Sequence, residues 1–351
     1  MASTDKKKLQ VISNEVSNNS ANSASTKAVA NYRSRDLTRG VWELARFHTR
    51  EAWLCWYPAV WGACLAAGTQ DIALSPYEFC RILFGIWSSV TATHAAFCTF
   101  DDICDCGFDA HVERCKTRPL PSGMISYGEA VTVFIAWILI IIAITHCTLG
   151  EAAVITFIPI WGLSLIYPVM KRLIPFPQVV LGAVMGAAVF PGWAAVTEDL
   201  SGLEQGLPLF AATMSWVIYF DVFYATQDHQ DDAKIGVKSV AVLLGDKTWM
   251  FLGALALLQV GFFAITAFKA NMSWMFWILG IGVWAVNLPW HVFSLDTSNR
   301  ESGGQIFKAN IMLGLYMTGI ALAELLTTRV YMKTLLHMFD RQGGSSLNKT
   351  A

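Results

Sequence analysis

Long apolar runs separated by short polar segments occupy most of this chain. Residues 130–149 (AVTVFIAWILIIIAITHCTL) contain no charged side chain over about 20 positions, enough to cross a bilayer core roughly 30 Å thick. Because a lipid-exposed backbone must satisfy its own hydrogen bonds, such runs are expected to be helices. Similar runs recur near residues 52–69, 79–100, 152–170, 179–197, 209–227, 249–268, 274–295 and 311–328. The pattern predicts an all-α, polytopic membrane protein with about nine transmembrane helices in one domain.

The two ends of the chain are polar. Residues 1–40 are rich in Ser, Asn and Ala, and no apolar segment follows Lys6–Lys8 as it would in a signal peptide. We therefore expect a disordered tail over 1–40, a transmembrane domain over 41–335 and a polar tail over 336–351. The first tail is not Arg-rich, so an endomembrane such as the endoplasmic reticulum is a better expectation than the mitochondrial inner membrane.

The distribution of charge predicts which loops face the cytosol. Nine Lys and Arg residues lie between Lys6 and Arg50, and most of the others follow the second, fourth, sixth and eighth predicted spans. The positive-inside rule places the N-terminus and these loops in the cytosol. The formal net charge is −1, which gives no global basic field for nucleic acid, so no nucleic-acid partner is expected.

A first acidic cluster lies at the end of the second span, in FDDICDCGFDAHVERCKTRPLPSG (100–123). On a helix, Asp102, Asp105 and Asp109 occupy positions i, i+3 and i+7 and share one face. Arg118 follows in the adjoining loop.

A second cluster ends the sixth span, in YFDVFYATQDHQDDAKIGVKS (219–239). A continuous helix would align Asp221, Tyr224, Asp228 and Asp232 on one stripe. Either cluster alone is compatible with a solvated, salt-bridged loop. Two carboxylate stripes on the same side of a membrane favour a bound Mg²⁺, which prefers carboxylate oxygen and leaves positions open for phosphate. Nearby Lys and Arg would bind the phosphates, so the predicted ligand is a diphosphate with a long apolar tail.

Aromatic residues surround both clusters and could stabilise an allylic carbocation by cation–π attraction once the diphosphate leaves. Tyr224 is the strongest of these candidates, because it lies on the acidic stripe. The full set is Phe97, Phe100, Phe108, Trp216, Tyr219, Phe220, Phe223 and Tyr224.

Five segments in order resemble the motifs of the UbiA superfamily of intramembrane aromatic prenyltransferases. DDICDCGFD (101–109) is similar to NDxxDxxxD, with Asp101 in place of the usual Asn, and RCKTRPLPSG (114–123) is similar to RxxxRPLxSG. YPVMKRLIPFPQVVLG (167–182) resembles the basic loop after the fourth helix, YATQDHQDDAKIGVKS (224–239) the second aspartate motif, and FKANIMLG (307–314) a helix-nine signature. The resemblance covers nearly all of the chain after about residue 40. It implies a helical bundle with a central cavity that opens to the cytosolic side.

The resemblance also implies roles for individual residues. The carboxylates of Asp102, Asp105, Asp109, Asp228 and Asp232 would hold Mg²⁺ on the diphosphate of a prenyl donor. Further basic residues would contact its oxygens: Arg118, Lys171, Arg172 and Lys238. The implied reaction is ionisation of the prenyl diphosphate and attack by an electron-rich aromatic carbon.

The sequence leaves two types of aromatic acceptor open. The sequences YPVMKRLIPFPQ and DDAKIGVKS resemble those of fungal enzymes that transfer a farnesyl group to a phenolic polyketide during meroterpenoid biosynthesis in secondary metabolism. The expected acceptor is then a phenolic acid. The alternative is a 4-hydroxybenzoate polyprenyltransferase of ubiquinone biosynthesis. Outside this family, intramembrane aspartates would also suit a cation-coupled transporter.

Overall fold

The computed structural model describes residues 35–70, 74–110, 112, 115–174, 176–227 and 240–347, without the side chains of 171, 172, 241, 300 and 328–347. The described residues form helices, turns and irregular segments, with no strand among them. The helices are α2 (Leu37–Leu44), α3 (Glu51–Thr69), α4 (Pro76–Asp109), α5 (Tyr127–Leu149), α6 (Glu151–Leu173), α7 (Gln178–Gly186), α8 (Val189–Thr197), η1 (Leu203–Gly206), α9 (Leu207–Ala225), α11 (Val240–Leu244), η2 (Gly245–Lys247), α12 (Thr248–Lys269), η3 (Phe276–Gly282), α13 (Val283–Ser294) and α14 (Arg300–Leu347). Regular structure thus reaches into both stretches that the sequence marks as tails.

Eight helices in the described part of the chain are long and apolar enough to cross a membrane, which confirms the predicted all-α membrane fold. The predicted span at 52–69 forms α3 but is not among these eight. Its length is sufficient, but Trp53, Trp56, Tyr57 and Trp61 carry polar N–H or O–H groups that lower its hydropathy. These aromatic residues therefore explain why eight candidate spans are found where the sequence predicts nine.

The described residues divide into two compact units. The first contains residues 35–47 and 98–134, and its small core consists of Leu44, Ile103, Leu120, Ile125 and Ala130. The second contains residues 48–97 and 135–347, which include most of the bundle. Helices α4 and α5 each contribute residues to both units.

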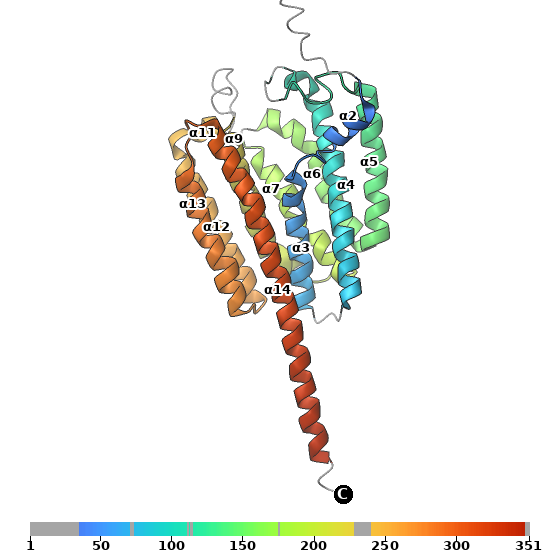
Figure 1. The fold of residues 1–351 in the computed structure, drawn as a ribbon, viewed down its shortest axis with the longest axis vertical. Helices are drawn as coiled ribbons and strands as arrows, with labels where there is room; N and C mark the ends of the chain where they lie inside the picture. Colours follow the sequence, from blue (N-terminus) through green and yellow to red (C-terminus); the bar gives the residue numbers. More distant parts are fainter. Residues whose placement is uncertain are drawn as a thin grey trace, which may run out of the picture. The chain divides into compact units, whose positions relative to one another are not determined.

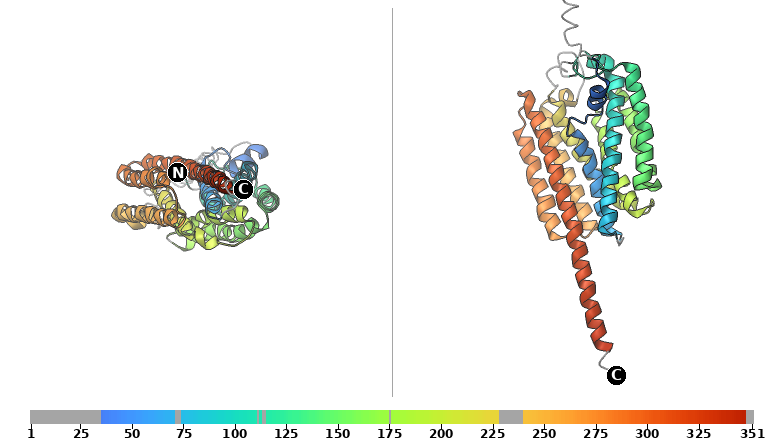
Figure 2. Two further views of the ribbon diagram at one scale, coloured as in Figure 1. Left: turned by 90° about the horizontal axis from the view of Figure 1, so that it is seen from below. Right: turned by 45° about the vertical axis from the view of Figure 1, so that its right-hand side comes forward.

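Within the second unit, α3 packs against α8 and α14, and α9 packs against α7 and α12. Figures 1 and 2 show α14 running beside α12 and α13 and then continuing beyond them. A Cβ atom added to Gly62 of α3 would collide with the carbonyl of Val189, and one added to Gly192 of α8 would collide with the carbonyl of Ala59. These two glycines let the helix backbones approach closely, as small residues do in membrane helix pairs.

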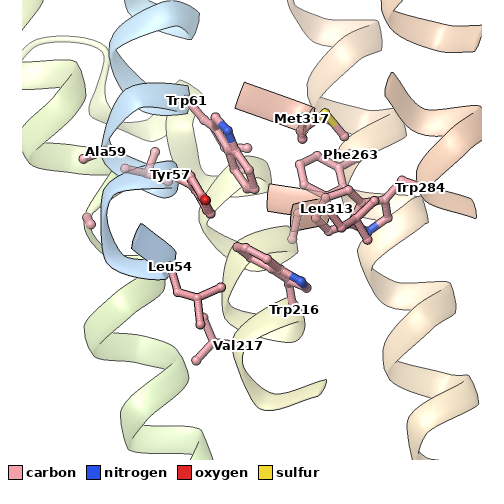
Figure 3. Close-up of a cluster of buried hydrophobic side chains, with 14 of the residues drawn as sticks. Leu54, Tyr57, Ala59, Trp61, Trp216, Val217, Phe263, Trp284, Leu313 and Met317 are labelled. Carbon is pink, nitrogen blue, oxygen red and sulfur yellow. The ribbon is translucent and has the colours of Figure 1, made fainter. Parts of the chain in front are cut away.

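A cluster of aromatic rings forms the centre of the second unit (Figure 3). The ring centroids of Trp61 and Trp216 are 5.4 Å apart, and those of Trp216 and Trp284 are 5.3 Å apart with an edge-on orientation. Tyr57 and Phe263 complete the cluster. Such contacts add about 0.5–1.5 kcal/mol per pair to simple burial. The cluster fixes α3, α9, α12 and α13 relative to one another within the unit.

Candidate active site

The first acidic cluster lies on a helix, as the spacing predicts. Helix α4 continues to Asp109, so it carries all three aspartates of the motif. Asp102 is fully buried, Asp109 is buried and Asp105 is half-buried. Carboxylates are rarely buried without a charged partner, so the surroundings of Asp102 decide what this end of α4 can do.

A compact turn after α4 positions the first partner. In RPLPSG, the amide of Ser122 donates to the carbonyl of Arg118 at 3.0 Å, and the amide of Gly123 donates to Leu120 at the same distance. Gly123 has φ 73°, a left-handed conformation that glycine adopts without steric penalty. Leu120 is anchored in the small core of the first unit. The turn therefore holds Arg118 over the end of α4.

Two arginines bind the buried aspartates. Arg118 Nη1 lies 2.7 Å from Asp109 Oδ2 and 3.2 Å from Asp102 Oδ1. Arg46 Nη2 donates to the same Oδ1 of Asp102 at 2.6 Å. The two guanidinium groups and two carboxylates form one charge-balanced network, which offsets the desolvation of each member.

The network also fixes the protonation of its cations. Burial opposes the charge of Arg118, but the carboxylates of Asp102 and Asp109 outweigh that effect and raise its pKa. Burial likewise opposes the charge of Arg46, but its interactions with Asp102 and Cys98 together outweigh that effect and raise the pKa of Arg46. Both side chains carry a full positive charge wherever the protein is folded.

Sequence reasoning missed Arg46. In the sequence, Arg46 is one of nine basic residues that predict the topology, and no motif spacing links it to Asp102. The structure places it two residues after the end of α2 with φ 56°, an uncommon value for a residue with a side chain. Its Nη1 also donates to the carbonyl of Glu43 at 3.2 Å. Strained backbone of this kind persists where surrounding contacts hold it, often at functional sites.

The first cluster has the chemistry of a cation site. Asp102 Oδ2 is buried and has no hydrogen-bond partner among the described residues. A buried carboxylate oxygen without a partner is expensive unless a cation or water completes it. Nowhere in the described ranges do three His, Cys, Asp or Glu side chains converge to form a metal site on their own. The donor set of Asp102, Asp105 and Asp109 fits Mg²⁺ in oxygen chemistry.

The second acidic cluster is described only at its beginning. Helix α9 ends at Ala225 and carries Asp221 and Tyr224. Asp228, Asp232 and Lys238 lie outside the described residues. The predicted helical stripe is therefore described as far as Tyr224.

The other basic residues of the prediction lie on α6. Lys171 and Arg172 belong to its last turn, and their side chains are outside the described set. Their role as diphosphate contacts stays a prediction.

Four of the aromatic candidates lie in the core. Trp216, Tyr219, Phe220 and Phe223 are buried in the hydrophobic core of the second unit. The Tyr219 hydroxyl donates to the carbonyl of Leu288 at 2.7 Å, a contact between α9 and α13. The expectation that these four face a reacting cation is therefore replaced by a packing role. Tyr224 differs, because it is half-buried and lines a cavity.

The helix-nine signature FKANIMLG has a structural explanation. Fully buried Asn310 accepts from Trp216 Nε1 at 2.9 Å, donates to the carbonyl of Ile306 at 2.9 Å and lies 3.5 Å from His291 Nδ1. A Cβ atom on Gly314 would collide with the ring of Tyr57. The signature thus joins α14 to α3, α9 and α13.

The start of α14 packs tightly against the end of α9. A Cβ atom on Gly303 would collide with the carbonyl of Phe223 and with Thr226 Oγ1. The carbonyl belongs to the backbone, so relief requires one helix to move. The segment that would move leads directly into the second aspartate motif.

We expect Gly303→Ala to destabilise the protein by about 1–3 kcal/mol, because it overpacks this contact. Any activity that depends on the second aspartate motif should fall as well, since the end of α9 is displaced. Gly319→Ala is the matched control, because no atom lies within 4 Å of a Cβ atom added there. Thermal unfolding in detergent measures both variants. Equal midpoints for the two would contradict the assigned contact.

Comparison with known proteins identifies relatives of this chain. The sequence profile described as the UbiA prenyltransferase family matches residues 55–315. The polyprenyl transferase macG of Penicillium terrestre is 64% identical over 87% of this chain and 95% of that protein. The polyprenyl transferase yanG of Aspergillus niger is 60% identical over 85% and 93%. The mitochondrial 4-hydroxybenzoate polyprenyltransferase of Schizosaccharomyces pombe is 32% identical over 77% and 75%.

Solved structures show the same fold. A UbiA homolog from Aeropyrum pernix K1 superposes with a TM-score of 0.65 at 21% identity, covering 79% of this chain and 99% of that one. A UbiA homolog from Archaeoglobus fulgidus bound to GPP and Mg²⁺ has a TM-score of 0.62 at 18% identity, covering 82% and 99%. The sequence match spans most of the chain and includes the motifs that surround Asp102. The protein is therefore a member of the UbiA prenyltransferase family.

Proposed function

We propose that this membrane prenyltransferase transfers a farnesyl group from farnesyl diphosphate to a ring carbon of a phenolic acceptor, in a Mg²⁺-dependent reaction. One observation carries the proposal. A fully buried aspartate, Asp102, is held by Arg46 and Arg118 through one oxygen, while its other oxygen has no described partner. A carboxylate beside two fixed cations suits a site that takes a metal together with a diphosphate.

The acidic and the basic residues would both act on the leaving diphosphate. Asp102, Asp105 and Asp109, with Asp228 and Asp232, would hold Mg²⁺, which supplies neutralising charge for the departing diphosphate. Arg118 stands beside this cluster with a permanent positive charge and would bind diphosphate oxygens. Lys171, Arg172 and Lys238 would add further contacts.

The reaction exchanges two bonds. The bond between C1 of the prenyl group and the diphosphate oxygen breaks, and the diphosphate leaves with the electron pair. The allylic cation then bonds to the aromatic carbon, which gives up its ring proton. A motif carboxylate or the released diphosphate takes that proton. Tyr224 would stabilise the cation through its ring.

Among related activities, the comparisons favour a polyprenyl transferase of the fungal type. Identity to macG and yanG is 64% and 60%, against 32% to the fission yeast 4-hydroxybenzoate polyprenyltransferase. We therefore prefer a phenolic polyketide of meroterpenoid biosynthesis to the ubiquinone precursor. Membership of a prenyltransferase family also argues against the alternative function, a cation-coupled transporter. An endomembrane, such as the endoplasmic reticulum, is the expected location.

The direct test uses membranes that contain the full-length chain, Mg²⁺, labelled farnesyl diphosphate and a panel of phenols. We expect a phenol with one farnesyl group on a ring carbon, together with released diphosphate. Preference for longer polyprenyl diphosphates with 4-hydroxybenzoate would support the ubiquinone-type enzyme instead. Absence of transfer to every phenol would reject the proposal.

A further inference from the structure

A cavity of about 60 Å³ lies in the second unit, where the C-terminal ends of α3 and α12 meet η3 and the middle of α14. This volume holds a group of a few heavy atoms, about the space of several water molecules. Leu209 of α9 lines the cavity, and Tyr224 lies 15 residues further along the same helix, about 22 Å away. The cavity is therefore separate from the end of α9 that leads into the second aspartate motif.

A buried carboxylate forms part of the cavity wall. Glu324 is buried, belongs to the candidate span Glu301–Thr327 and lines the cavity. Its Oε1 accepts from the amide of Ser273 at 2.7 Å, and its Oε2 accepts from the Ser273 hydroxyl at 2.5 Å. No Lys, Arg or His in the part of the chain that the structure describes forms an ion pair with Glu324. An ionisable side chain without a counter-charge is costly in a membrane span and usually has a function.

Aromatic rings line the same cavity. Trp61, Phe263 and Phe276 are buried and contribute to its wall, and the ring centroids of Trp61 and Phe263 are 5.8 Å apart. Figure 3 shows the first two in the central aromatic cluster. The hydroxyls of Thr69 and Thr266 also belong to lining residues, but they donate to carbonyls of their own helices. A carboxylate among aromatic rings suits a cation, and an alkylated ammonium group in particular.

The mouth of the cavity lies at the ends of membrane spans. Helices α3 and α12 end at Thr69 and Lys269, and a short turn joins α12 to the next span. Phe268 and Trp274, which flank this turn, are 77% and 74% exposed. Exposed aromatic side chains at the ends of spans are typical of the membrane–water interface. Asn271 in the turn is exposed and lines the cavity, so the cavity opens at the level of the lipid headgroups.

The charges near the mouth match a zwitterion. Lys269 is exposed and directly precedes the lining residue Ala270. A zwitterionic phospholipid carries an ammonium and a phosphate a few bonds apart. With the ammonium in the cavity beside Glu324, the phosphate would remain near the turn that carries Lys269, where opposite charges attract. An anionic headgroup without an ammonium would instead bring its negative charge toward Glu324.

We propose that this cavity binds the ammonium headgroup of a zwitterionic phospholipid, whose acyl chains stay in the surrounding bilayer. Glu324 supplies the opposite charge, and the rings of Trp61, Phe263 and Phe276 contact the alkyl groups on the nitrogen. The bound headgroup holds the turn between α12 and η3 against α14. This site concerns lipid binding, so it does not depend on the proposed transfer reaction.

The first test compares two lipids on the wild-type chain. Purified full-length protein in detergent receives dioleoyl phosphatidylcholine or dioleoyl phosphatidylglycerol, and native mass spectrometry measures the Kd of the first bound lipid. We expect phosphatidylcholine to bind about tenfold more tightly, the effect of roughly 1.4 kcal/mol. Equal affinity for the two lipids, or tighter binding of phosphatidylglycerol, would overturn the inference.

A competition experiment identifies the source of the ammonium group. Choline chloride should displace phosphatidylcholine only weakly, because choline lacks the acyl chains that hold the lipid in the apolar layer. Displacement by choline at the same concentration as by the lipid itself would assign the cavity to a soluble ammonium ion and reject the lipid.

Two variants and a control test the assigned carboxylate. Glu324→Gln keeps the size of the side chain and an oxygen that can accept from Ser273, but it removes the charge. It should weaken phosphatidylcholine binding by about tenfold or more and leave phosphatidylglycerol binding unchanged. Ser273→Ala removes one hydrogen bond and keeps the charge, so it should retain most of the binding. Glu204→Gln, at an exposed residue of η1 outside the cavity, is the matched control and should bind as the wild type does.

Thermal unfolding in detergent separates a lost ligand from a lost fold. Added phosphatidylcholine should raise the midpoints of the wild type and of Glu204→Gln, but not that of Glu324→Gln. Unchanged phosphatidylcholine affinity in a folded Glu324→Gln protein would refute the site. An equal loss in Ser273→Ala would attribute the effect to the shape of the turn and would refute it as well. If Glu324→Gln does not fold, Lys269→Gln decides at an exposed position, since it should weaken phosphatidylcholine binding and an unchanged Kd would reject the proposal.

Discussion

Replacing Asp102 by asparagine should reduce prenyl transfer by about a thousandfold, the scale seen when one preorganised charge-stabilising group is lost. Asparagine keeps the shape of the side chain and an oxygen that Arg46 can contact. It removes the negative charge that fits this buried position for a cation. The measurement is kcat with saturating farnesyl diphosphate and phenol in membranes. A readout of folding is needed beside it, because Arg46 and Arg118 lose a charged partner.

Two measurements separate loss of chemistry from loss of fold. Arg118 retains its 2.7 Å contact with Asp109, so the variant should still show cooperative thermal unfolding in detergent. Asp246→Asn, at an exposed residue of η2, changes the same charge away from the cluster and should keep wild-type activity. A folded Asp102→Asn protein with near-normal turnover would refute the metal assignment.

The sequence predicted the elements of the site better than its contacts. Apolar runs located nearly every helix, because a backbone in lipid has few alternatives to helical hydrogen bonding. The spacing of Asp102, Asp105 and Asp109 predicted a shared helix, and α4 carries all three. Periodicity is a local property, so it can be read along the chain.

Pairings across the chain could not be obtained in the same way. Arg46 is 56 residues from Asp102 in sequence, and its approach depends on the turn after α2 and on the small core around Leu44. Trp216 and Phe223 looked like candidates for a reacting cation because they flank the acidic motif. Their burial is set by α3, α12 and α13, which local spacing does not describe. Tertiary packing decides these roles.

Removal of divalent metal should stop the reaction completely, and added Mg²⁺ should restore it. The five motif aspartates would repel a diphosphate unless a cation lies between them, and Arg46 and Arg118 balance the charge of only Asp102 and Asp109. Transfer is measured after treatment with EDTA and exchange into chelator-free buffer. Binding of labelled farnesyl diphosphate, measured without acceptor, should disappear in parallel.

The same treatment should leave the fold intact, because the salt bridges of Arg46 and Arg118 hold Asp102 and Asp109 in place. The thermal midpoint with EDTA should therefore equal that with Mg²⁺ in the absence of donor. Asp102→Asn should need a higher Mg²⁺ concentration for half-maximal donor binding, while Asp246→Asn should match the wild type. Undiminished transfer after thorough chelation would show that the arginines and lysines alone neutralise the leaving group. A fall in midpoint that accounts for the lost activity would give the metal a structural role instead.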